Sequence, residues 1–313
     1  MAIKEFLPEG TNAAHLLMDL LSLGKESVYR RMRGEIEFTL DEMIKITNRF
    51  GISIDDIIAS GKITSKWAIL NLDTLVTYEN YTEQYCERLK EYLAIFQKMQ
   101  SAKRANISTA SNAIPISFLF LYKKLSQFRH YKWHYLKRGA KPNFAFSSMV
   151  LPDEIIKIEK HFAEESNKVP MKTIVIDEDI FLCIIRDIRF FYSQQLITKM
   201  EMLELKQELL ELVSLIELVV ETGSFYAGNS MMIYLSKINI DGIYHNIEYD
   251  NEELCFQGTF YMDLICFNNV KFFKKQKEWI DLLKRFSILL TQSGDRQQLE
   301  FFENQRLLIN SLE

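Results

Sequence analysis

Residues 16–58, LLMDLLSLGKESVYRRMRGEIEFTLDEMIKITNRFGISIDDII, decide the fold of the amino-terminal part of this chain. They predict four short helices around one small core, because apolar residues recur at helical spacing between turn residues. The first predicted helix spans Asn12–Leu20 and is followed by a tight turn at residues 21–24. The second spans Lys25–Arg33, where Val28 and Met32 lie four residues apart on one face, and Gly34 ends it.

Two further helices are predicted from their capping residues. Thr39-Leu40-Asp41-Glu42 has the pattern of a capping box, so a third helix is expected to begin there and to end before Gly51. Ser53 is expected to cap a last short helix, whose first turn carries acidic residues that the helix dipole favours, namely Asp55 and Asp56.

The second helix carries the charges that suggest a function. It holds several basic residues against one acid, Glu26; the basic residues are Lys25, Arg30, Arg31 and Arg33. With Val28 facing inward, Ser27, Arg30 and Arg31 are expected on the outer side and Tyr29 beside it. Two helices joined by a short turn, the second with outward basic residues, form a helix-turn-helix that fits the DNA major groove. Arg can bond guanine there, and Lys, Tyr and Ser can hold phosphates.

The stretch LSLGKESVYRRMRGEIEFTLDEMIKITNRFGISIDDII resembles the lambda-repressor-like (Cro-type) helix-turn-helix regulators of bacteria and phages. The resemblance covers about the first 60 residues of the chain. It implies that residues of the second helix face bases or phosphates and that Arg33 lies near the DNA backbone. The resulting candidate DNA-binding set is Lys25, Glu26, Ser27, Tyr29, Arg30, Arg31 and Arg33.

Composition agrees with a soluble globular protein of two or three domains. The 313 residues are 48% apolar and 26% charged, and only 11 Gly and 5 Pro favour long helices with few turns. The net charge of −4 does not exclude DNA binding, which needs only a local basic surface. No secretion signal and no long uncharged apolar run is evident. The cysteines form no CxxC pair and are expected to be buried thiols. A cytoplasmic protein is therefore expected.

The remainder of the chain predicts a mainly α fold. We expect a helix-turn-helix DNA-binding domain at residues 1–61 and a helical dimerisation or sensor domain at residues 62–313. Long helices are predicted at residues 78–104, 116–137, 153–165, 177–222, 274–291 and 296–312. A small three-stranded antiparallel meander is predicted near the carboxyl terminus, at residues 231–240, 244–249 and 254–267.

Residues 92–152 contain no acidic side chain. Their basic residues suggest a second phosphate-contacting surface, or a pocket for an anionic ligand, formed by Lys123, Lys124, Arg129, Lys132, Lys137 and Arg138. The alternative is that acidic residues of another helix cover this stretch in the fold; the candidates are Glu201, Glu204, Glu208 and Glu211.

A second regular pattern lies within residues 199–222. Apolar residues recur there at the spacing of a coiled-coil seam: Met202, Leu205, Leu209, Leu212, Ile216 and Val219. This seam predicts either a dimer interface or the central helix of the domain's own core. Extra apolar residues around the seam favour the core.

No catalytic constellation is evident in the sequence. P-loop, GxGxxG and GxSxG motifs are absent, and we expect no enzyme, no metal and no cofactor. His130 and His134 have metal-ligand spacing but no third ligand nearby, so packing explains them better. His15, His161 and His245 also have no evident partner.

The sequence thus predicts a DNA-binding transcriptional regulator that acts on double-stranded DNA as a homodimer, since two half-sites multiply specificity. One alternative is a protein-interaction module whose helix-turn-helix no longer reads DNA, which acids near the basic helix favour: Glu35, Glu37, Asp41 and Glu42. Another is a regulator gated by a small-molecule effector that binds the carboxyl-terminal domain. No membrane association is expected.

Overall fold

The computed structural model divides the chain into two compact units, Met1–Ile69 and Leu70–Glu313. It describes residues 13–50, 70–71, 80–137, 144–259, 263–267, 269–293 and 296–313. The predicted fourth helix from Ser53 lies outside these residues.

The first unit contains three helices around a small apolar core. They are α1 (Ala13–Leu21), α2 (Lys25–Met32) and α3 (Leu40–Phe50). Residues from all three helices are buried together: Ala14, Leu17, Leu21, Val28 and Ile46. The three helices predicted for residues 12–50 are therefore confirmed, and Val28 is fully buried as its spacing predicts.

The ends of these helices follow the predicted capping chemistry. Gly34 takes a left-handed φ of 79°, and α2 ends in the two hydrogen bonds of a Schellman motif. Glu35 N–H donates to Arg30 O at 2.9 Å, and Gly34 N–H donates to Arg31 O at 3.0 Å. At the start of α3 the capping box is confirmed. Thr39 N–H donates to Glu42 Oε2 at 2.9 Å, and Glu42 N–H donates to Thr39 Oγ1 at 3.3 Å.

The second unit is built on a mixed sheet of eight strands in the order β1-β7-β6-β5-β2-β3-β4-β8. The central strands β2, β3 and β4 are parallel, and their neighbours on both sides are antiparallel. The strands are β1 (Leu70–Asn71), β2 (Ala105–Ser111), β3 (Met171–Ile176), β4 (Ser230–Ser236), β5 (Ile243–Tyr249), β6 (Glu252–Thr259), β7 (Asp263–Phe267) and β8 (Ser287–Leu289).

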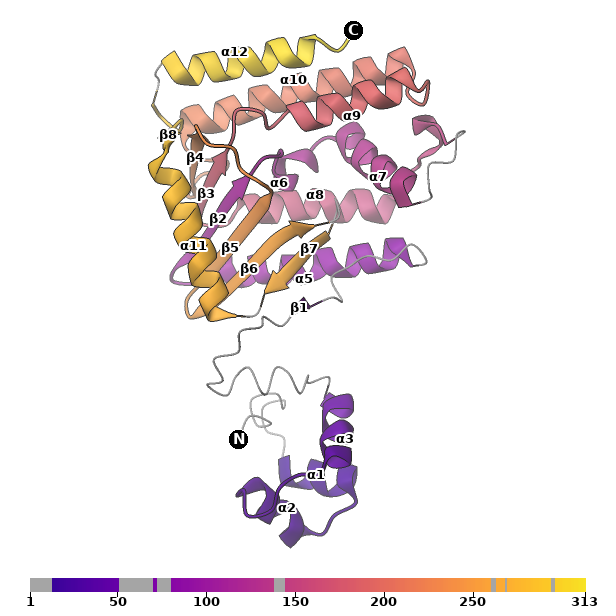
Figure 1. Ribbon diagram of the computed structural model, residues 1–313, viewed down its shortest axis with the longest axis vertical. Helices are drawn as coiled ribbons and strands as arrows, with labels where there is room; N and C mark the ends of the chain where they lie inside the picture. Colours follow the sequence, from indigo (N-terminus) through magenta and orange to yellow (C-terminus); the bar gives the residue numbers. More distant parts are fainter. Residues whose placement is uncertain are drawn as a thin grey trace. The chain divides into compact units, whose positions relative to one another are not determined.

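Helices cover both faces of this sheet (Figure 1). One face packs on most of the helices through a large apolar cluster, and the other is covered by α11 through Ile280 and Leu283. The helices are α5 (Tyr81–Ser101), α6 (Ile116–Leu119), α7 (Lys123–Lys137), α8 (Asp153–Asn167), α9 (Leu182–Ser193), α10 (Lys199–Thr222), α11 (Val270–Arg285) and α12 (Arg296–Asn310), with a 3₁₀ turn at Phe146–Ser148.

The prediction of a mainly α fold with a small three-stranded meander is wrong. The fold is mixed α/β with a large sheet, because β2 and β3 add a parallel centre that the sequence pattern does not reveal. β4 pairs in parallel with β3, so the meander consists of β5, β6 and β7. β2 has the sequence ANISTAS, whose small polar residues are typical of a loop rather than of a central strand.

The coiled-coil spacing in α10 belongs to the core of its own unit. All six seam residues are buried within the chain: Met202, Leu205, Leu209, Leu212, Ile216 and Val219. The seam therefore packs inside the second unit and is not available as a dimer interface.

Candidate functional site

The outer side of α2 carries the residues expected to bind DNA. Val28 anchors the helix in the core, while Lys25, Glu26 and Arg30 are exposed and Tyr29 is 37% exposed. Ser27 is half-buried. An α-helix with its side chains is about 10–12 Å across, which fits a B-DNA major groove about 12 Å wide.

Arg30 on α2 and Arg33, the residue that follows α2, share an acidic neighbour. Arg33 Nε lies 2.6 Å from Glu35 Oε1, and Arg30 Nε lies 3.3 Å from Glu35 Oε2. The hydrogen bond from Arg33 lowers the pKa of Glu35, and the Arg30 charge acts in the same direction. All three side chains are about half exposed, so a phosphate can compete with Glu35 for the guanidinium groups.

Arg31 has a different environment from the other arginines. Its side chain is only 13% exposed, its Nε lies 3.0 Å from Glu42 Oε2, and its Nη1 lies 3.4 Å from Ser27 O. This ion pair lowers the pKa of Glu42 and joins α2 to the capping box of α3. Arg31 therefore holds the two helices together, and a direct contact with DNA would require this pair to open.

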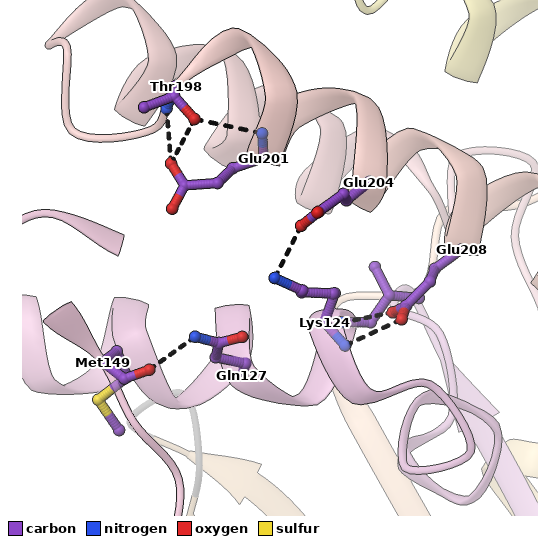
Figure 2. A network of polar contacts seen from close by, with 8 residues as sticks. Lys124, Gln127, Met149, Thr198, Glu201, Glu204 and Glu208 are labelled. Atoms are coloured by element: carbon purple, nitrogen blue, oxygen red, sulfur yellow. Dashed lines mark hydrogen bonds and ion pairs between the residues drawn. The ribbon is translucent and has the colours of Figure 1, made fainter. Parts of the chain in front are cut away.

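The basic stretch before Asp153 is dispersed by the fold rather than gathered on one surface. Figure 2 shows Lys124 facing α10, where its Nζ lies 2.7 Å from Glu204 Oε2. Glu208 accepts the backbone N–H groups of Lys124 and Leu125 at 3.1 and 2.8 Å, which places a carboxylate at the start of α7 where the helix dipole favours it. Glu201 caps α10 itself through Thr198.

The other members of this basic stretch also contact their own unit. Lys132 pairs with Asp187, Arg129 is buried over the ring of Phe120, and Lys137 lies over the ring of Trp133. Lys123 is exposed, and Arg138 lies outside the described residues. Acidic side chains of α9 and α10 thus take two of these charges, which favours the alternative interpretation of this stretch over a second phosphate-binding surface.

His130 belongs to a buried polar cluster that the sequence does not reveal. Its Nε2 lies 2.8 Å from Glu159 Oε1, and its Nδ1 contacts the hydroxyl of Tyr81. Tyr85 donates to Glu159 Oε1 at 2.5 Å, and Ser126 donates to Glu159 Oε2. Burial lowers the pKa of His130, although the hydrogen bond to Glu159 opposes this effect, and the net shift favours the neutral imidazole. The acid is 29 residues away in the sequence, on α8, which is why spacing alone gives His130 no partner.

A cavity between the sheet and the helices α5 and α8 contains two further titratable groups. Lys172 on β3 is 4% exposed, and His245 on β5 is half-buried with its Nδ1 2.9 Å from Thr109 Oγ1. Burial lowers the pKa of Lys172 to about 7, and burial with the Lys172 charge lowers the pKa of His245 to about 4. The signal for Lys172 in the sequence is one lysine in an apolar run, KTIVI, directly after Pro170 and Met171.

The buried Lys172 predicts a rise of stability with pH. Between pH 7 and 8.5 the unfolded chain binds a proton on this lysine that the folded chain releases, so the free energy of unfolding of the second unit increases. We expect a gain of roughly 1.5 kcal/mol over this range relative to the Lys172→Met variant. Urea unfolding at several pH values measures it. Parallel curves for the two proteins would contradict the prediction.

Two thiols act in the opposite direction near the top of this range. Burial raises the pKa of Cys255 to about 12 and that of Cys266 to about 11, so their unfolded forms ionise first, from an ordinary pKa near 9, and this lowers the stability. Both proteins contain these thiols, so the comparison with Lys172→Met removes their effect. Cys86 is buried as expected, whereas Cys183 is exposed, so the expectation of four buried thiols is wrong. Cys183 lies on the outward face of α9.

Two further findings concern metals and membranes. Within the described ranges, no three His, Cys, Asp or Glu side chains are grouped so that they could hold a metal ion. None of the helices in the same ranges has the length and apolar character needed to cross a membrane.

In comparisons with protein-family models, curated proteins and solved structures, no match to this chain was found. A function for the chain must therefore come from its own residues and their geometry.

Proposed function

We propose that this chain is a DNA-binding transcriptional regulator whose first unit inserts α2 into the major groove. The observation that carries the proposal is the two-sided character of α2. Its inner side is fixed by the fully buried Val28, while its outer side presents Lys25, Tyr29 and Arg30 to solvent. This combination matches a recognition helix, in which Arg and Lys reach base edges and phosphates.

The proposed regulator acts as a homodimer. One eight-residue helix contacts only a few base pairs, whereas two copies about 34 Å apart read two half-sites on one side of the duplex. The dimer interface must lie elsewhere than on the α10 seam, which is buried in its own unit. Sedimentation of the full chain, alone and with DNA, measures the number of copies.

The test is selection of bound sequences from a random DNA library with the full chain, followed by titration of the best sequence at low and high salt. We expect one sequence family with paired half-sites and an affinity that falls as salt rises, because each phosphate contact releases counterions. Absence of an enriched sequence would refute specific DNA binding. An affinity that does not change with salt would refute the phosphate contacts.

A second candidate function has an observation of its own. Glu35 pairs with Arg30 and Arg33, and Glu42 pairs with Arg31. Each of these three arginines therefore already has an acidic partner within the first unit. A protein-interaction module would have this mixed surface. The Glu35→Gln variant separates the two functions. Its affinity for DNA should rise because Arg30 and Arg33 lose their acidic partner, whereas its affinity for a protein partner that contacts Glu35 should fall.

A further inference from the structure

The cavity in the second unit has the form of a ligand pocket. It lies between one face of the sheet and the helices α5 and α8, and its cavity volume is about 70 Å³. Apolar walls with a few polar groups are typical of small-molecule sites, and a volume below the roughly 300–1,000 Å³ of drug-sized sites restricts this cavity to a small ligand. The apolar wall consists mainly of Tyr92, Phe96, Phe162, Ile174, Ile247 and Phe256.

Strand register places the polar groups of the pocket next to one another. Lys172 on β3 is paired with Ile107 on β2, and two residues further along β2 Thr109 is paired with His245 on β5. Side chains two residues apart on a strand lie on the same face. Lys172, Thr109 and His245 therefore face the helices from three adjacent strands, and all three line the cavity.

The ammonium group of Lys172 is held in a fixed position. Its Nζ donates to Ser166 Oγ and to Asn167 Oδ1, both at 2.9 Å. The Asn167 amide is itself oriented, because its Nδ2 donates to Ser117 O at 3.3 Å and leaves the oxygen for the lysine. An ammonium group has three N–H donors, so one remains for a ligand in the pocket that Lys172 lines.

The two partners of Lys172 are neutral, which is unusual for a buried cation. Among the described residues no carboxylate forms an ion pair with Lys172, and burial alone accounts for its lowered pKa. Burial of an unpaired charge is costly, and a counter-ion removes much of this cost. A bound anion would supply the charge that the surrounding side chains do not.

We propose that this pocket binds a small monocarboxylic acid with an apolar body. The carboxylate accepts a hydrogen bond from Lys172 in its charged form, and the apolar body packs on Phe96, Phe162 and Phe256. A monocarboxylate fits better than a phosphate or a dicarboxylate, because one cation faces it and most of the lining is apolar. The cavity volume of about 70 Å³ restricts the ligand to an acid with a short apolar body. The proposal does not depend on DNA binding by the first unit.

The test compares acids with their neutral amides on the full chain by calorimetry and thermal shift. The probes are propionate, isovalerate and phenylacetate, each with the matching primary amide. We expect at least one acid to bind saturably and to raise the melting temperature, with its amide about 10–100-fold weaker, since a charge-assisted hydrogen bond is lost. Absence of binding by all three acids, or equal binding of acids and amides, would overturn the proposal.

Variants locate the binding in the pocket. Lys172→Met keeps the length and apolar stem of the side chain. We expect this variant to bind the acid about 10–100-fold more weakly, as the unaltered chain binds the amide. Lys160→Met, which removes an exposed lysine from α8, should leave binding unchanged. Equal acid affinity in Lys172→Met and the unaltered chain would overturn the proposal. If Lys172→Met does not fold, the comparison of acids with amides on the unaltered chain decides.

Discussion

Replacement of Arg30 by Ala is expected to weaken binding of the full chain to its selected DNA sequence by about 1–3 kcal/mol, which is roughly 5–150-fold. Arg30 is half exposed on the outer side of α2, where its guanidinium group can reach a guanine edge or a phosphate. Its only described ion pair is with Glu35 on the surface, so its loss should change the stability of the first unit little. Fluorescence anisotropy at fixed salt measures the affinity.

The sequence dependence of the loss distinguishes a base contact from a phosphate contact. A base contact by Arg30 relaxes specificity at one position, whereas a phosphate contact weakens all sequences alike and lowers the salt slope by about 1. Lys25→Ala should behave in the second way, because Lys25 is exposed in the first turn of α2. Lys160→Ala removes the same charge from the second unit and serves as the control. Full affinity in both α2 variants would show that another surface reads the DNA.

The three helices of residues 13–50 could be predicted because their signals are local. The stop at Gly34, the Thr39–Glu42 capping box and the inward spacing of Val28 each depend on neighbours within a few residues. The ion pair of Arg31 with Glu42 was not predicted, because it joins two helices whose relative rotation the sequence does not define.

The parallel centre of the sheet was not predicted because β2 lacks the usual strand signal and the sequence does not show how the central strands pair. β2 contains a single large apolar residue, Ile107, and its burial depends on hydrogen bonds of Thr109 and Ser111 rather than on apolar side chains. β3, by contrast, has an ordinary strand signal, because the β-branched run Thr173–Ile176 lies between Pro170 and Asp177, and only its parallel pairing is hidden. Parallel strands are joined through long helical connections, so no turn sequence indicates their pairing.

The pocket and the His130 cluster were missed for a related reason. Lys172 meets Thr109 and His245 only through the pairing of β2 with β3 and β5, and His130 meets Glu159 only where α7 packs near α8. The sequence shows each of these residues alone, and an isolated histidine or lysine is usually structural or exposed. Prediction of such sites requires the strand order, which comes from the fold as a whole.

Replacement of Glu159 by Ala is expected to lower the free energy of unfolding of the second unit by about 3–5 kcal/mol. Glu159 is 1% exposed and accepts hydrogen bonds from three side chains, Tyr85, Ser126 and His130. Its removal leaves three buried donors without their acceptor, and each such donor is costly. Glu154→Ala, an exposed change on the same helix, should cost less than about 0.5 kcal/mol.

The pH dependence of the Glu159→Ala variant tests the charge state of the cluster. Burial raises the pKa of Glu159, but hydrogen bonds from His130, Ser126 and Tyr85 outweigh it and the net pKa is lowered. The carboxylate therefore contributes stability above its unfolded pKa, and this contribution is lost as the pH falls. Urea unfolding followed by circular dichroism should show a smaller difference between Glu159→Ala and the unaltered chain at pH 4 than at pH 7. A constant difference would mean that folding leaves the pKa of Glu159 unchanged. A larger difference at pH 4 than at pH 7 would mean that Glu159 is protonated in the folded chain, and the cluster would then be a neutral hydrogen-bond network.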